Sequence, residues 1–141
     1  MKENKKYFID TNVFLRVLIR EDKKTFLECK KLFERIKKGE IQAYTSSLVL
    51  AEIHWVLNSF YKLQKKEILK ALASILNLRH LKITEKVDPA LALRLYSNFK
   101  VKFIDCLIAS NPEIFSKKTT IISYDKDFDK LGVKRKTPSQ I

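Results

Sequence analysis

Four acidic residues of this chain stand inside, or directly after, segments that are otherwise mostly apolar. The segments are Tyr7-Phe8-Ile9-Asp10, Leu48-Val49-Leu50-Ala51-Glu52-Ile53, Phe103-Ile104-Asp105-Cys106-Leu107-Ile108 and Ile121-Ile122-Ser123-Tyr124-Asp125. A carboxylate in or against a hydrophobic core costs several kcal/mol unless a partner offsets its charge. A partner shared by all four constrains the fold strongly, because the fold must bring four distant segments together. We interpret these acids as candidate metal ligands.

Short apolar segments alternate with segments of helical periodicity along most of the chain. Strands are predicted at residues 7–9, 41–45, 81–84 and 119–123, with an edge strand beginning near 132–133. Helices are predicted at residues 13–20, 25–38, 48–60, 65–76, 89–99 and 104–110. Strands separated by helices favour an α/β layered fold with a largely parallel sheet, whose ligands bind beyond the carboxyl ends of the strands.

This fold would bring the four acids to one edge of the sheet. Asp10 and Asp125 follow strands, whereas Glu52 and Asp105 fall early in helices that begin at the same edge. Taken singly, each acid has an ordinary interpretation as a turn residue, a helix cap or a water-facing side chain. That interpretation is weakest for Glu52, because residues 48–57 are apolar apart from it and His54.

The charge balance favours a polyanionic partner. The chain has 29 Lys+Arg against 16 Asp+Glu and a formal net charge of +13, so nucleic acid is the leading partner class. Any single basic pair, such as Lys117-Lys118, is equally well explained as a solvated helix end. At 141 residues we expect a single domain, 1–141, with basic tails at 1–6 and 134–141.

Missing residue types exclude several classes of enzyme. Gly39 and Gly132 are the only glycines, and a phosphate-binding loop needs at least two close together, so P-loop and dinucleotide folds are excluded. Serine-hydrolase chemistry lacks its G-x-S-x-G motif, and only His54 and His80 are available as bases. No long apolar run indicates a signal peptide or membrane span, so we expect a cytoplasmic protein without membrane contact.

The donor types favour a hard cation. Clustered carboxylates repel one another unless a divalent ion offsets the repulsion, and all-oxygen sites favour Mg²⁺ or Mn²⁺ over zinc. Cys29 and Cys106 are too far apart in the sequence to indicate a zinc or disulfide pair. One or two such ions can activate water and hold a phosphodiester oxygen during hydrolysis.

The four segments resemble, in order and spacing, the four motifs of PIN domains. The matching stretches are Asp10-Thr11-Asn12, Ser47 to Glu52, Phe103 to Ala109, and Ser123-Tyr124-Asp125-Lys126-Asp127-Phe128. The resemblance extends from about residue 7 to residue 133 and is greatest to the VapC-type toxins of toxin–antitoxin pairs. It implies a three-layer α/β/α fold with a parallel sheet of about five strands. It also implies a Mg²⁺- or Mn²⁺-dependent endoribonuclease that hydrolyses RNA with metal-activated water.

The resemblance assigns roles to individual residues. The acids implied to bind metal and act in catalysis are Asp10, Glu52, Asp105 and Asp125. The polar residues implied to orient these acids and their waters are Thr11, Asn12, Ser123 and Asp127. Asp127 has a second interpretation, which we favour, as the cap of a short helix at Phe128.

The resemblance also implies a small antitoxin partner and a homodimer. Phe14, Leu18, Phe60 and Tyr61 either line an antitoxin groove or belong to an ordinary core, which is the favoured interpretation for each. Two alternatives stay open, namely an RNA-processing PIN nuclease without antitoxin and a non-catalytic RNA- or partner-binding module. A haloacid-dehalogenase-type phosphatase fits less well, because it needs Asp-x-Asp where this chain has Asn12 at the second position.

Overall fold

A five-stranded, wholly parallel sheet forms the centre of the molecule in a computed structural model, which describes residues 5–141. Its strands are β1 (Lys6–Ile9), β2 (Gln42–Thr45), β3 (Leu81–Ile83), β4 (Thr119–Ile122) and β5 (Arg135–Lys136). Their spatial order is β3-β2-β1-β4-β5, and every neighbouring pair is parallel. The predicted α/β fold is confirmed. Of the predicted N-terminal tail, residues 1–4 lie outside the described residues and Lys6 belongs to β1.

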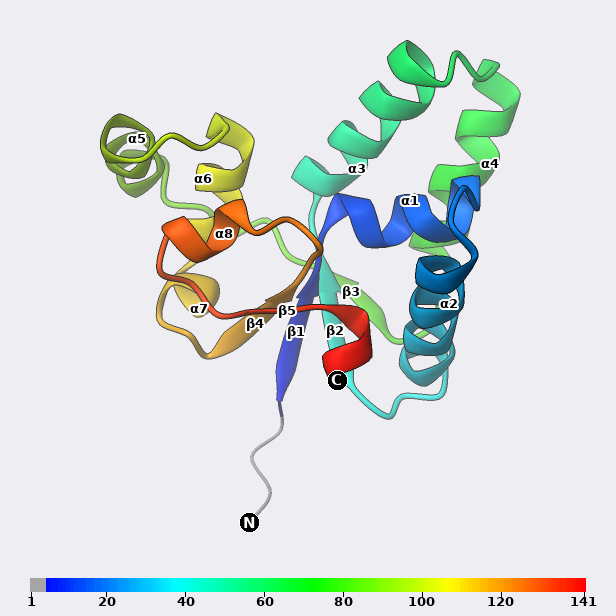
Figure 1. The fold of residues 1–141 in the computed structure, drawn as a ribbon, viewed down its shortest axis with the longest axis horizontal. Coiled ribbons are helices and arrows are strands. Elements are labelled where there is room, and N and C mark those ends of the chain that lie inside the picture. Colours follow the sequence, from blue (N-terminus) through cyan, green and yellow to red (C-terminus); the bar gives the residue numbers. More distant parts are fainter. Residues whose placement is uncertain (1–4) are drawn as a thin grey trace.

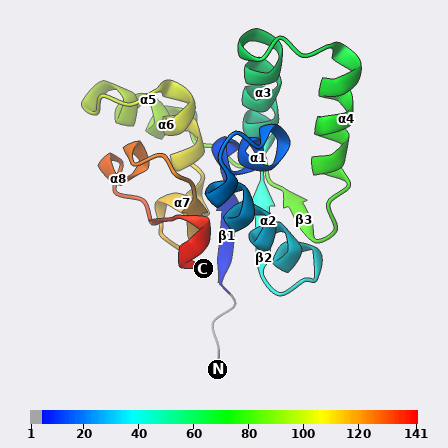
Figure 2. The same cartoon turned by 45° about the vertical axis from the view of Figure 1, so that its right-hand side comes forward.

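Helices cover both faces of this sheet. They are α1 (Thr11–Ile19), α2 (Lys23–Lys37), α3 (Ser47–Trp55), the π-helix η1 (Val56–Phe60), α4 (Lys65–Leu76), α5 (Pro89–Asn98), α6 (Phe103–Ala109), α7 (Pro112–Phe115), α8 (Asp127–Lys130) and the 3₁₀ turn η2 (Pro138–Gln140). The chain moves from β1 to β3 in one direction and from β4 to β5 in the other. Because crossovers are right-handed, the two series of helices lie on opposite faces. Figures 1 and 2 show α1–α4 on one side and α5–α8 on the other.

Local sequence signals fix several helix ends. The Ser46 side chain accepts from the Val49 amide at 3.4 Å at the start of α3, and Asp88 accepts from the Leu91 amide at 3.1 Å at the start of α5. Gly39 follows α2 with a φ of +75°, a conformation that glycine adopts without strain. None of the helices in the described part of the chain is long and apolar enough to cross a membrane.

Three predicted boundaries were wrong. Thr11 and Asn12 belong to α1 instead of preceding it, because Asp10 occupies the N-cap position. The predicted helix 48–60 is α-helical only to Trp55 and continues as η1. The predicted basic tail 134–141 contains β5 and η2, and Pro138 is buried. The charged residues 134–136 were expected to be solvated, but they form a strand because β4 supplies hydrogen-bond partners to β5 at the edge of the sheet.

β1 and β4 end side by side where the strand order changes direction, and we call the region beyond their carboxyl ends the acidic crevice, because such sheets bind ligands there. These strands are neighbours, yet the chain leaves them toward opposite faces, which is the switch point where α/β sheets bind ligands. The Asp10 amide donates to the Ile122 carbonyl at 3.1 Å and keeps the two ends in register. The strand residues Phe8, Ile9, Ile121 and Ile122 are buried in the core. The strands therefore hold the two connections that follow them in fixed positions.

Candidate active site

Asp10 lies at this switch point. It directly follows β1, and only 3% of its surface is exposed. Its Oδ2 accepts a hydrogen bond from the Ser123 hydroxyl at 2.7 Å and a longer one from the Asn12 amide at 3.3 Å. Its Oδ1 is buried without a hydrogen-bond partner among the described residues. One carboxylate oxygen is therefore held in place and the other is available to a ligand.

Ser123 and Asn12 link the two connections at the switch point. Asn12 Nδ2 donates to Ser123 Oγ at 2.9 Å, and Asn12 Oδ1 accepts from the Tyr124 amide at 3.1 Å. Ser123 Oγ also accepts from the Asp125 amide at 3.0 Å. A hydroxyl that accepts from two amide groups has its own proton free to donate to Asp10. This network fixes the orientation of the Asp10 carboxylate.

Glu52 reaches the same region from α3. It is half-buried, and its Oε1 accepts a hydrogen bond from the hydroxyl of Thr11, which is the first residue of α1 and is buried. A threonine at this place therefore orients an acid that is 41 positions away in the sequence.

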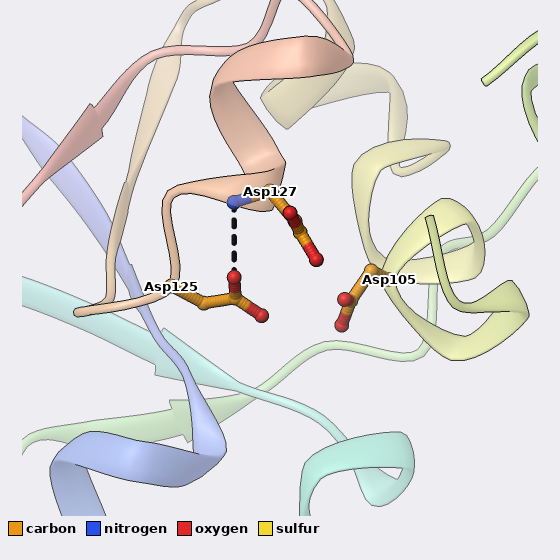
Figure 3. A group of neighbouring side chains, drawn as sticks. All are labelled: Asp105, Asp125 and Asp127. Atoms are coloured by element: carbon orange, nitrogen blue, oxygen red, sulfur yellow. Dashed lines mark hydrogen bonds between the residues drawn. The ribbon is translucent and has the colours of Figure 1, made fainter. Parts of the chain in front are cut away.

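Three further carboxylates converge from the other side of the crevice. Asp105 lies in the first turn of α6, whereas Asp125 and Asp127 lie on the β4–α8 connection and at the start of α8 (Figure 3). One carboxylate oxygen from each of the three lies within 4.8 Å of the others. The Asp127 amide donates to Asp125 Oδ1 at 2.9 Å, and Asp127 Oδ1 forms an ion pair with Lys130 Nζ at 3.1 Å.

Burial and mutual repulsion raise the pKa of the two most buried acids. Burial raises the pKa of Asp10 to about 6, with smaller upward contributions from the negative charges of Glu52 and Asp125 and an opposing one from the Ser123 hydrogen bond. Burial also raises the pKa of Asp105 to about 7, to which the charges of Asp10, Asp125 and Glu52 contribute. The four predicted acids thus share one electrostatic environment, and none of the groups that face Asp105 neutralises it fully.

This donor set fits a hard divalent cation. The buried oxygens Asp10 Oδ1 and Asp105 Oδ2 have no hydrogen-bond donor within the described chain. An unsatisfied buried carboxylate oxygen is costly, and a cation is a partner that would compensate for it. All the converging donors are carboxylate oxygens, which Mg²⁺ and Mn²⁺ prefer.

Comparison with known proteins agrees with this geometry. The family model of the PIN domain matches residues 7–134. The chain belongs to the PIN domain family. A curated relative, the VapC ribonuclease of Aquifex aeolicus (strain VF5), is 27% identical over 130 residues, which are 92% of this chain and 95% of the relative.

Solved structures show the same fold. VapBC2 from Rickettsia felis, bound to a DNA fragment from its promoter, matches with a TM-score of 0.65 and 20% identity over 94% of this chain and 98% of that chain. Mycobacterium tuberculosis VapC20, described as a sarcin-ricin loop cleaving toxin, matches with a TM-score of 0.62 and 18% identity over 90% and 95% of the two chains. This PIN domain therefore has the three-layer fold of VapC structures, and its predicted likeness to VapC-type toxins is confirmed.

Of the four predicted acids, the structure groups the carboxylates of Asp105 and Asp125 with that of Asp127, whereas Asp10 and Glu52 lie outside this group and interact with it through their charges. The roles assigned to these residues stay predictions. The favoured interpretation of Asp127 as a helix cap was wrong, because Lys126 occupies the N-cap position of α8 and the Asp127 carboxylate lies with those of Asp105 and Asp125. Sequence reasoning missed Lys130, the ion-pair partner of Asp127. Its spacing of three residues in a helical segment was the available signal.

Proposed function

We propose that this chain is a divalent-metal-dependent endoribonuclease that hydrolyses phosphodiester bonds of RNA, as the toxin of a toxin–antitoxin pair. The observation that carries the proposal is the pair of buried, partnerless oxygens on Asp10 and Asp105, in an acidic crevice at the switch point of a PIN domain. The similarity to a VapC ribonuclease supports RNA as the substrate class. A protein that cleaves cellular RNA would act in the cytoplasm.

Four acids would hold the metal, namely Asp10, Glu52, Asp105 and Asp125, and Asp127 adds a fifth carboxylate to the group. When bound, Mg²⁺ or Mn²⁺ would activate a water molecule and offset negative charge on the scissile phosphate. The chain's own contribution is orientation. Ser123 fixes one oxygen of Asp10, Thr11 fixes Glu52, and the Asp127 amide fixes Asp125.

An apolar concavity supports the antitoxin part of the proposal. It has a volume of about 160 Å³ between α1, α2 and α4. Its lining residues are Phe14, Val17, Leu18, Phe33, Ser74, Ile75 and Leu78. An amphipathic segment of a small protein would bury its apolar face there. Of the residues predicted from sequence, Phe14 and Leu18 line this concavity, whereas Phe60 is 71% exposed and packs edge-on against Tyr61.

Exposed apolar residues on α5 and α6 support a homodimer. Leu93 is 62% exposed and Tyr96 51% exposed, and the Tyr96 ring packs edge-on against Phe103 at 5.5 Å. A second copy would remove this surface from water. Light scattering of wild type and of the Leu93→Lys variant would test the homodimer. We expect a dimer for wild type and a monomer for the variant.

RNA cleavage tests the enzymatic proposal directly. End-labelled single-stranded RNA and tRNA would be incubated with wild type in Mg²⁺, in Mn²⁺ and in EDTA. We expect cutting in either metal and none in EDTA, with a loss of orders of magnitude for Asp105→Asn.

A matched pair of glutamate variants separates the site from general effects. Glu52→Gln should lose cleavage, whereas Glu34→Gln, on the exposed side of α2, should retain it. Equal activity of Asp105→Asn and wild type contradicts the proposal. Intact RNA with every metal, despite a folded protein that binds RNA, favours the non-catalytic binding module instead.

A further inference from the structure

The amino ends of the central strands carry a second charged feature, opposite in sign to the acidic crevice. Among the described residues 5–141, a concavity of about 490 Å³ is lined there by six lysines and one acid, Glu113. The lysines are Lys5, Lys6, Lys117, Lys118, Lys134 and Lys136, and we call this surface the lysine pocket. A concave surface that carries mostly one sign of charge concentrates the field and attracts ions of the opposite sign.

The register of the sheet explains why lysines from three strands gather. Tyr7 of β1 stands beside Thr120 of β4, and Ile122 of β4 stands beside Lys136 of β5. Side chains alternate between the faces of a strand, so Lys118 shares a face with Thr120, and Lys134 shares it with Lys136. Alternation thus places Lys118, Lys134 and Lys136 on one face of the sheet, whereas Lys6 alternates with Tyr7 and reaches the pocket from the other face.

The lysines of the pocket are available to a ligand. The ion pairs within residues 5–141 involve other basic groups, namely Arg35–Glu40, Lys130–Asp127 and Arg135–Asp129. One lysine also stands where the backbone favours glycine, because Lys117 has a φ of 66° after α7. Its place in the pocket gives that lysine a role which a glycine at this position would lack.

We propose that the lysine pocket binds the phosphodiester backbone of RNA away from the point of cleavage. Lysine is a point charge that contacts phosphate without reading a base, so six lysines without arginine indicate sequence-independent contact. The choice of RNA rests on the proposed function. The acidic crevice repels a polyanion, so the protein needs a positive surface elsewhere to hold its substrate.

Lys5, Lys6, Lys117 and Lys118 lie near the amino ends of β1 and β4, whereas Lys134 and Lys136 lie along β5, and Lys136 stands beside Ile122. β1 runs from Lys6 to Ile9, with Asp10 directly after it, so about 13 Å of strand separates Lys6 from Asp10 at ~3.3 Å per residue. Figure 1 shows α7 and the starts of β1 and β4 at one end, and the β1–α1 and β4–α8 connections at the other. An RNA that occupies both must pass around the edge of the molecule. Short RNA would reach the crevice alone.

Fluorescence anisotropy of a labelled single-stranded RNA, measured in the cleavage-deficient Asp105→Asn background, tests the pocket. The test variant carries Lys117→Gly, Lys118→Ala and Lys134→Ala. The control variant removes the same charge from exposed positions of α4 with Lys65→Ala, Lys66→Ala and Lys70→Ala. Each lost phosphate contact is worth about fourfold at ~0.15 M salt, so we expect at least about tenfold weaker binding and a shallower salt dependence for the test variant only.

One further variant gives a change in the opposite direction, which misfolding does not produce. Glu113→Gln removes the acid that lines the pocket within the described part of the chain, and it should tighten RNA binding by about twofold to fourfold. Lys117→Gly should also keep or raise thermal stability, because it relieves the left-handed backbone.

Four outcomes overturn the proposal. Two come from the variants, namely equal losses of RNA affinity in the test and control variants, and an unchanged affinity for Glu113→Gln. The other two are RNA binding that depends on the acidic crevice alone, and a pocket that binds inorganic tripolyphosphate but does not bind RNA. With cleavage-competent protein, the test variant should raise KM for long RNA and leave kcat unchanged. If no form of the protein cleaves RNA, wild type included, the enzymatic proposal is contradicted, whereas the binding measurements still test the lysine pocket.

Discussion

Replacing Asp105 by asparagine should stabilise the metal-free protein at alkaline pH much more than at acidic pH. Burial raises the pKa of Asp105 from 3.8 to about 7. Between these values the folded state holds a proton that the unfolded state releases, so stability falls as pH rises through this window and stays low above it. Each pKa unit is worth ~1.4 kcal/mol, so the full cost is about 4 kcal/mol above pH ~7. At about pH 4.5 roughly 1 kcal/mol of this cost is present.

The Asp105→Asn variant lacks this titration. Its free energy of unfolding relative to wild type should therefore rise by about 3 kcal/mol between pH ~4.5 and pH ~8. The buried amide has a cost of its own, but that cost does not depend on pH and cancels in the comparison. The repulsion between Asp10 and Asp105 is already included in the raised pKa of Asp105 and adds nothing further.

Urea unfolding followed by circular dichroism, at the two pH values and in EDTA, measures this difference. Asp22→Asn is the control, because Asp22 is exposed and its pKa is lowered by hydrogen bonds from Thr25. That contribution is present above pH ~4 and is lost only as pH falls below it, so the control should change little between the two conditions. A difference between Asp105→Asn and wild type that stays constant within ~1 kcal/mol would refute the reasoning.

Three further variants test the support of the site and of the fold. Ser123→Ala removes the hydrogen bond to Asp10 and should lower metal affinity or activity by about tenfold to 100-fold, measured by Mn²⁺ titration of cleavage. Ser46→Ala removes the α3 cap and should cost ~1 kcal/mol in unfolding free energy without changing cleavage at saturating metal. Gly39→Ala should lower the free energy of unfolding by at least ~1 kcal/mol, because φ is +75° and the added Cβ would lie 3.2 Å from His80 Nε2. An unchanged melting temperature would contradict this prediction.

Much of the fold was readable because its signals are local. Caps such as Ser46 and Asp88, the stop at Gly39 and the apolar strand segments each act within a few residues. The arrangement of the strands follows from right-handed crossovers once the alternation of strands and helices is recognised. Asp10 and Asp125 were predictable because they follow strands that end at one edge.

The rest depends on contacts between distant segments. The sequence placed Thr11 just before the predicted helix 13–20, and only the packing of α1 beside α3 gives its hydroxyl Glu52 as an acceptor. Asp127 looked like a cap, because local propensity cannot show that Asp105 approaches it from α6. The short strand β5 has little apolar pattern, and its hydrogen-bond partners are supplied by β4.

Charge separation across the sheet gives the metal a role that is distinct from holding RNA. The acidic crevice lies beyond the carboxyl ends of β1 and β4, whereas the lysine pocket starts at their amino ends and extends along β5. Without metal the crevice repels a polyanion, whereas the lysine pocket attracts it in any metal condition. EDTA should therefore abolish cleavage of long RNA but leave most of its affinity, measured by anisotropy at constant ionic strength. If EDTA removes binding and cleavage together, the metal site holds the RNA and the lysine pocket contributes little.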